Sequence, residues 1–380
     1  MNNSGSTVGD SKVKEEKPSK TTTNRKIDHL EICCDDNYDV EMSKSTGFED
    51  ILFVHKAAPE INFDEITLDT QFLKHKFNFP IFISPITGGA KEGKKINKML
   101  GKIAEEYSIG IGVGSQRAAL EDSSLESTFK VVRENAPTAF VAANLGAIQL
   151  NNDYGLEEVN NTIKMISANA LVLHLNPLQE IIQPEGETNF RNLIPKIAKM
   201  SKELKQPVIV KEIGSGIALE EANKLVRANV AAIDIAGAGG TSWSKVEAIR
   251  ANQQGYDVNS RVGELFGNWG IPTAYSTLEV SLLKDKIEII SSGGIRNGLQ
   301  AAKALAIGAK LVGIALPIVR LSYTSTEKQL VNYIEQFIQE LKTTMFLVGA
   351  KNLDELKQVP LAFVGKIAQW LTARGFNLQE

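Results

Sequence analysis

The stretch KIEIISSGGIRNGLQAAKALAIGAKLVGIALP, residues 286–317, shows the order of elements from which the fold is predicted. An apolar run ends at the pair Gly293 and Gly294, a helical pattern follows from Asn297 to Gly308, and a second apolar run closes the stretch. Strand, glycine turn, helix and strand in this order form a βαβ unit of a parallel sheet.

The glycine pair predicts an anion site. Two adjacent glycines between a strand and a helix N-terminus let backbone N–H groups approach a phosphate, and the helix dipole adds positive potential there. Arg296 lies two residues further on. Taken alone, the pair is equally compatible with an ordinary βα turn.

The same unit repeats along the chain. Helical patterns separate apolar runs of strand length, which begin 23 to 37 residues apart except for one 55-residue step from Ala231 to Lys286. The runs are residues 80–88, 109–116, 139–146, 170–176, 207–214, 231–237, 286–294 and 309–317. Eight βα units predict an α/β fold, a closed (β/α)₈ TIM barrel whose site is built from the loops that follow the strands.

Outside the barrel strands, the chain divides into a tail and one domain. Residues 1–24 hold few apolar side chains and are predicted to be a disordered tail, while residues 25–380 are predicted to be a single TIM-barrel domain. Extra helices are expected at 326–347 and 353–373 after the barrel.

Three further segments carry predictions. Short strands are expected near 51–54 and 65–68. The long excursion at 238–271, after the sixth strand, is predicted to be a lid or disordered.

Composition limits the classes of partner. With 42 basic and 45 acidic residues the net charge is −3, so nothing predicts a general attraction to nucleic acid or to a membrane surface. The two cysteines, Cys33 and Cys34, are adjacent and poorly placed to form a structural disulfide. No apolar run reaches the ~20 residues of a membrane span. We therefore predict a soluble cytoplasmic protein.

The fourth strand ends in polar side chains. His174 and Asn176 are two residues apart and project from one face of a strand. Gln179 and Glu180 follow, and a lone carboxylate beside substrate phosphates is a normal Mg²⁺ site. A structural histidine with a solvated acid is the alternative.

Lys211 stands near the end of the fifth strand. A lysine in a barrel mouth requires an anionic partner, which these residues leave open as Glu212, a substrate or an electron-rich cofactor. Further hydrogen-bonding residues follow the second, third and sixth strands, and they are Ser115, Gln116, Arg117, Asn144 and Thr241. We predict that these loops converge on one polar site.

Several other kinds of chemistry are disfavoured. No G-x-G-x-x-G follows a strand, which disfavours a dinucleotide fold, and Lys95 stands where the P-loop spacing from Gly88 needs Ser or Thr. The four histidines are His29, His55, His75 and His174, so none follows the fourth strand. An FMN-dependent hydroxyacid oxidase with a late histidine base is therefore disfavoured.

From residue 25 to the C-terminus, the chain resembles the type 2 isopentenyl-diphosphate isomerases. The resemblance is carried, in order, by the motifs RKIDHLEIC, SPITGG, GVGSQR, AANLG, LHLNPLQEIIQPEGE, KEIGSG, GAGGTSW, SGGIRNG and GIALP. It implies a TIM-barrel flavoprotein that interconverts isopentenyl and dimethylallyl diphosphate by a 1,3-proton shift. It also implies FMN that is reduced by NADPH and acts as an acid/base catalyst, a requirement for Mg²⁺, and a homotetramer or homo-octamer.

The resemblance also assigns roles to residues. The implied FMN contacts are Ser84, Pro85, Ile86, Thr87, Ser115, Asn144, Lys211, Thr241, Gly293, Gly294, Arg296, Ala315 and Leu316. The implied substrate contacts are Arg25, Lys26, Ser115, Gln116, Arg117 and Gln179. Glu180 matches the Mg²⁺ ligand, and the residues near the reacting carbons are His174, Asn176 and Gln179, of which Gln179 is expected to position groups before it relays a proton.

Two alternatives stay open. One is an FMN-dependent oxidoreductase on the same barrel, and the other is a non-catalytic protein that binds a phosphate ligand.

Overall fold

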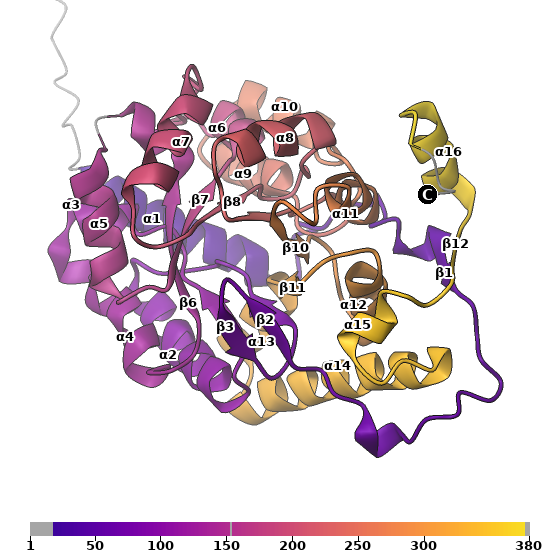
Figure 1. Ribbon diagram of the computed structural model, residues 1–380. Coiled ribbons are helices and arrows are strands. Elements are labelled where there is room, and N and C mark those ends of the chain that lie inside the picture. The colour runs from indigo at the N-terminus through magenta and orange to yellow at the C-terminus, as the bar shows by residue number, and fades with distance from the viewer. Residues whose placement is uncertain (1–17, 153, 377–380) are drawn as a thin grey trace, which may run out of the picture.

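The chain folds as a (β/α)₈ barrel (Figure 1), and the computed structural model describes residues 18–152 and 154–376, with side chains from residue 22. Its strands form a closed parallel barrel in the order β10-β11-β4-β5-β6-β7-β8-β9. Their bounds are β4 (Ile81–Ile83), β5 (Gly110–Gly112), β6 (Val141–Gly146), β7 (Ala170–His174), β8 (Val208–Lys211), β9 (Ala232–Asp234), β10 (Glu288–Ser292) and β11 (Leu311–Ile314). Each lies within one of the eight predicted runs, so the predicted fold class is confirmed.

Alternation along these strands separates two apolar clusters. In β4, Ile81 and Ile83 belong to the cluster between strands and helices, whereas Phe82 belongs to the smaller cluster inside the barrel. The same alternation places Val172 and Ile209 inside. The barrel interior is therefore a packed apolar layer.

A hairpin closes the N-terminal end of the barrel. It is formed by β2 (Thr70–Phe72) and β3 (His75–Phe77), which pair antiparallel. Phe72 and Phe77 pack with Phe82 and Phe140, with the ring centroids of Phe72 and Phe140 5.8 Å apart. This aromatic floor leaves the C-terminal end of the barrel as the place for a pocket.

Helices surround the barrel because each buries one apolar face. In α2 (Lys91–Glu106), Ile96, Leu100 and Ile103 recur at helical spacing and are buried against the strands. The other helices of the βα units are α3 (Arg117–Glu121), α4 (Ser127–Asn135), α5 (Leu156–Met165), α6 (Pro177–Ile182), α7 (Leu193–Glu203), α8 (Leu219–Arg227), α11 (Thr273–Ser281), α12 (Gly298–Ala306) and α13 (Leu316–Thr324). Short 3₁₀ turns are η1 (Phe48–Asp50), η2 (Phe63–Glu65), η3 (Ser123–Leu125) and η4 (Ala147–Asn151).

The excursion at 238–271, predicted as a lid or disordered, is helical. It forms α9 (Trp243–Gln253) and α10 (Asp257–Leu265). One stripe of α9 consists of Ser244, Glu247 and Arg250, all buried. Of the two alternatives disorder is wrong, and an apolar pattern does not detect a helix whose buried face is polar, which explains why the sequence did not show these helices.

The predicted disordered tail at 1–24 extends too far toward the C-terminus. Helix α1 (Pro18–Cys34) begins within it, and the rest of that prediction, residues 1–17, lies outside the described residues. Thr22 is buried, and its hydroxyl donates to Glu121 Oε2 at 2.9 Å. The helix packs against α3, α9 and α13. Composition missed it because the stabilising contacts come from distant parts of the chain.

The C-terminal region follows the prediction in part. Helix α14 (Glu327–Val348) matches it and packs beside α12 in Figure 1. The helix predicted at 353–373 is instead α15 (Leu353–Leu356), β12 (Leu361–Phe363) and α16 (Gly365–Ala373). Strand β12 pairs antiparallel with β1 (Ile51–Phe53), a contact that only the folded chain brings about.

The strand predicted near 65–68 is wrong. The segment begins with the end of η2 and continues as irregular backbone, and Thr67 N donates to Lys351 O at 2.9 Å. A tertiary contact replaces sheet pairing there.

Among the helices of the described residues, none combines the length and the apolar character needed to cross a membrane.

Candidate active site

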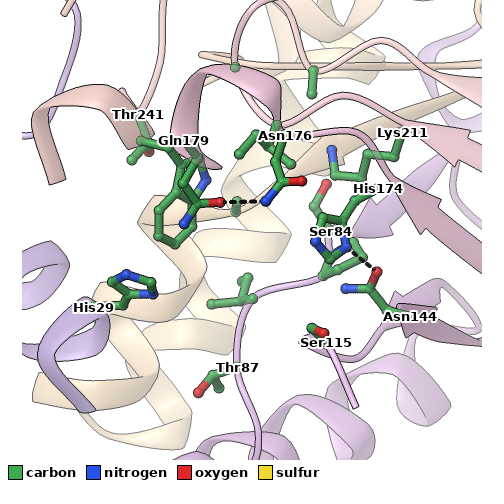
Figure 2. A pocket seen from close by; sticks show the side chains of 18 of the residues that line it. His29, Ser84, Thr87, Ser115, Asn144, His174, Asn176, Gln179, Lys211 and Thr241 are labelled. Carbon is green, nitrogen blue, oxygen red and sulfur yellow. Dashed lines mark hydrogen bonds between the residues drawn. The ribbon is translucent and has the colours of Figure 1, made fainter. Parts of the chain in front are cut away.

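A polar layer lies directly above the apolar interior of the barrel. It consists of the residues two positions after the inward apolar side chains, which alternation brings to the same inner face. These residues are Ser84, Asn144, His174, Lys211, Asp234 and Ser292. Most of them project toward one space in Figure 2. The predicted convergence of several loops on one site follows from this register.

A large cavity lies above this layer at the barrel mouth. About 1620 Å³ inside it is free of protein atoms, part of it open to solvent. Every residue that the resemblance assigned to the site lines it, except Gln116. Trp243, His29 and Gln183 also line it, although the sequence had not singled them out.

Lys211 has a protein partner that the sequence had not identified. Its Nζ lies 3.0 Å from Asp234 Oδ2 and 3.4 Å from Ser292 Oγ, and the Ser292 hydroxyl donates to Asp234 Oδ1. All three side chains are buried. Glu212, the neighbour considered as a partner, instead accepts from the backbone N–H groups of residues 213–215.

His174 is held as a neutral ring. Its Nδ1 lies 2.9 Å from Asn144 Oδ1, as Figure 2 shows. Burial, with the positive charges of Lys211, Lys26 and Arg25, lowers the pKa of His174 to about 4. A neutral ring that donates from Nδ1 keeps Nε2 as an acceptor.

The short helix α6 and the residue before it present three polar side chains to the pocket, those of Asn176, Gln179 and Glu180. Asn176 precedes it, and its Nδ2 donates to Gln179 Oε1 at 3.1 Å and to Glu180 Oε1 at 2.7 Å. Glu180 Oε2 accepts from the backbone N–H of Glu187 at 2.7 Å. Burial is the main cause that raises the pKa of Glu180. The positive charge of Arg25 acts in the opposite direction on this pKa, so the buried carboxylate lies near one cation.

Behind Gln179 lies a carboxylate that the sequence had not suggested. Gln179 Nε2 donates to Glu247 Oε1 at 2.8 Å, and the same oxygen lies 2.8 Å from His29 Nε2. Glu247 is fully buried. Although burial opposes it, contacts with His29, Gln179 and Arg250 lower the pKa of Glu247. Helices α1, α6 and α9 therefore meet at this carboxylate.

Helix α1 brings two cations to the pocket wall. Lys26 Nζ donates to Ser115 O, and within the described residues Lys26 makes no ion pair. Burial and the charge of Arg25 lower the pKa of Lys26 to about 7. Arg25 Nη1 lies 2.7 Å from the Gln183 side-chain oxygen when that amide is oriented to satisfy both neighbours. Within the described part of the chain neither cation forms an ion pair with a carboxylate, and two adjacent cations in this state favour an anionic ligand.

Arg117, the third predicted cation of this wall, is already paired. Its Nε lies 2.8 Å from Glu121 Oε1 and its Nη1 lies 3.2 Å from Glu187 Oε1. An anion at this wall therefore shares Arg117 with two carboxylates.

Gln116, predicted as a substrate contact, does not line the pocket. Its side chain is fully buried, donates to Thr162 O at 2.9 Å and accepts from Asn144 N at 3.1 Å. It points into the barrel wall because both its amide groups are used there. Its role is to position Asn144.

The glycine pair forms a tight cup after β10. Gly293 has φ +105° and Gly294 φ +71°, and a Cβ on either would lie 2.2 Å from a carbonyl oxygen of Gly237 or Gly239. Arg296 lies beside it, with Nη2 2.6 Å from Glu41 Oε2. Backbone at this cup lies at the N-terminal side of α12, as an anion site requires.

The sequence held a weak signal for one of the missed residues, His29. Arg25, Lys26 and His29 are spaced to share one face of a helix. Glu247 and Asp234 gave none, since their partners lie in other elements.

Comparison with known proteins places this pocket in a family. The chain is 43% identical over 360 residues to the isopentenyl-diphosphate delta-isomerase of Methanosarcina mazei, which covers 95% of this chain and 97% of that protein. It is 45% identical over 355 residues to the protein of the same name from Archaeoglobus fulgidus, covering 93% and 100%. The family profile described as FMN-dependent dehydrogenase matches residues 176–362.

Solved structures support the fold. A lactate oxidase of Pediococcus acidilactici superposes with a TM-score of 0.63 at 16% identity, covering 91% of this chain and 93% of that one. A flavocytochrome b2 superposes with a TM-score of 0.61 at 17% identity, covering 93% and 86%. At such identities the likeness concerns the barrel alone.

The neutral state of His174 predicts a pH dependence of stability. Its pKa is about 4 in the folded chain against 6.5 ordinarily, so between these values the unfolded chain binds the extra proton. The free energy of unfolding therefore falls as pH falls through this window, by up to roughly 3 kcal/mol from this group. Urea unfolding at pH ~4.5 and ~7 measures it.

In that experiment His174→Gln is expected to lose this part of the pH dependence. The control His55→Gln, at an exposed histidine, keeps it. Equal pH dependence in the wild-type protein and His174→Gln contradicts a neutral His174.

Proposed function

Since the chain belongs to the isopentenyl-diphosphate delta-isomerase family, we propose that it interconverts isopentenyl and dimethylallyl diphosphate by a 1,3-proton shift. The observation that carries this proposal is one cavity with two anion sites on different sectors of the barrel. One is the glycine cup after β10, and the other is the pair Arg25 and Lys26 on α1. A cofactor phosphate and a substrate diphosphate need two such sites.

The residues of the pocket fit FMN. The glycine cup suits its phosphate, and Lys211 suits the negative charge of its reduced ring. Ser84 Oγ and Asn176 Oδ1 are buried in the pocket wall, and among the residues that the structure describes neither has a hydrogen-bond partner. Residues proposed to hold it are Ser84, Pro85, Ile86, Thr87, Ser115, Asn144, Lys211, Thr241, Gly293, Gly294, Arg296, Ala315 and Leu316. When bound and reduced, FMN supplies acid/base chemistry at its ring, and NADPH is the proposed reductant.

Substrate binding is assigned to the wall formed by α1 and α3. Arg25, Lys26 and Arg117 supply positive charge, and the lowered pKa of Lys26 favours a bound anion because that anion would restore the charged ammonium. The Ser115 backbone carbonyl accepts from Lys26 in this arrangement. Gln179 contacts the substrate from α6.

Glu180 is proposed as the Mg²⁺ ligand. The described residues contain no group of three or more histidine, cysteine, aspartate or glutamate side chains that would hold a metal alone. Mg²⁺ suits a single carboxylate because it keeps several waters and takes substrate phosphates as ligands. Burial of Glu180, which raises its pKa, favours a nearby cation.

The remaining polar side chains position the reacting carbons and manage protons. The Gln179 amide is fixed at both ends, by Asn176 Nδ2 and by Glu247 Oε1, so it orients a bound substrate and is a poor acid itself. His29 and Glu247 lie behind it, with His29 Nε2 2.8 Å from Glu247 Oε1. Neutral His174 offers an acceptor at Nε2 and no acidic proton near neutral pH.

An FMN-dependent oxidoreductase is the second candidate. The profile match over 176–362 favours it. Against it, the sequence contains no histidine after His174, where the late histidine base of a hydroxyacid oxidase is expected. A homotetramer or homo-octamer and a cytoplasmic location are further proposals that rest on the family resemblance and on composition.

The proposed acid/base chemistry requires the reduced state of FMN. Purified protein is expected to be yellow, to lose its colour with NADPH or dithionite, and to convert isopentenyl diphosphate only in that reduced, anaerobic state. Product analysis by chromatography measures it, with NADPH consumption followed in parallel. Equal activity of flavin-free protein contradicts the proposal, and NADPH consumed in step with product favours the oxidoreductase.

The proposed Mg²⁺ site depends on the carboxylate of Glu180. Glu180→Gln is expected to raise the KM for isopentenyl diphosphate at limiting Mg²⁺ at least tenfold, since it removes the proposed ligand charge, while bound FMN is unchanged. Mg²⁺ titration of activity and flavin absorbance measure both. Glu157→Gln, an exposed change on α5, is the control. Loss of flavin from Glu180→Gln would place this residue in a structural role instead.

A further inference from the structure

A carboxylate outside the pocket controls the charge that Lys211 presents to it. Lys211 lines the cavity, whereas Asp234 does not and is fully buried. The ion pair at 3.0 Å joins them, and the Ser292 hydroxyl contacts both. The ammonium therefore faces the pocket with a negative charge directly behind it.

The barrel register fixes this arrangement. Lys211 and Asp234 are opposite each other in the pairing of β8 with β9, and Asp234 is opposite Ile290 in the pairing of β9 with β10. Two positions after Ile290, Ser292 shares its inward direction. Three adjacent strands thus supply one side chain each to the same inner face.

The ion pair of Lys211 and Asp234 leaves this part of the barrel wall with almost no net charge. An unpaired buried ammonium is costly, and Asp234 supplies the compensating negative charge at 3.0 Å when no anion is bound. The nearby Glu212 is committed to backbone N–H groups, and His174 is neutral. Asp234 is consequently the partner that balances Lys211 within the described residues.

We propose that Asp234 is a positioning residue that holds Lys211 toward the cofactor and limits the net positive charge that the reduced cofactor ring meets. This inference rests on the proposed function, in which the pocket binds FMN. Its consequence is that the wild-type site stabilises an anionic reduced ring less than Lys211 alone would. The carboxylate thereby sets the reduction potential of the bound flavin.

The experiment measures that potential in the holoprotein. Asp234→Asn keeps the shape of the side chain and removes the charge. It is expected to raise the equilibrium constant for flavin reduction about tenfold, or about 30 mV for a two-electron couple. Equilibrium reduction against a reference dye gives the value. Asp234→Ser, which also removes the charge, is expected to shift the potential in the same direction.

Glu288→Gln is the matched control, since it removes a carboxylate from the opposite end of β10, where Glu288 accepts from Leu73 N. It is expected to leave the potential unchanged. An unchanged or more negative potential in Asp234→Asn overturns the inference, as does loss of flavin from both neutral variants. Wild-type protein that binds no flavin would refute the proposed function instead, so the two failures are distinguishable.

Discussion

The strict alternation of side chains along short parallel strands is the constraint on which the site depends. Within the barrel, positions such as Phe82, Val172 and Ile209 fill the interior with apolar groups. The next inward position on each strand falls at the barrel mouth, and there the sequence places polar residues, His174 and Lys211 among them. The same geometry that packs the core therefore assembles the site, and a one-residue shift of register would bury those polar groups in the wall.

The two lysines of the pocket differ in whether a carboxylate balances their charge. Lys211 is balanced by Asp234 in the barrel wall, whereas Lys26 makes no ion pair within the described residues and its pKa falls to about 7. A balanced cation suits a ring that changes charge between states. An unbalanced one suits a permanent anion such as a diphosphate, whose binding restores the charged lysine. Glu180, a buried carboxylate, is the complementary element for a cation.

Much of the fold and of the pocket wall was predictable because it depends on local pattern. Eight apolar runs gave eight strands, and residues at the ends of those runs came together as strand polarity requires. Asp234 and Glu247 were not identified as site residues, because a carboxylate's role depends on which lysine or histidine the fold brings beside it. Gln116 was misassigned for the converse reason, since sequence places it at the rim but cannot show that both its amide groups are used in the wall. Helix α1 and strand β12 were missed because distant segments stabilise them.

The central claim is that one barrel mouth holds two phosphate-bearing molecules at separate sites. A crystal structure of the reduced protein with FMN, Mg²⁺ and isopentenyl diphosphate tests it most directly. The account predicts the FMN phosphate at Gly293 and Gly294 and the substrate diphosphate within hydrogen-bond distance of Arg25 and Lys26. A substrate diphosphate bound in the glycine cup, or an FMN phosphate held by Arg25 and Lys26, would contradict it.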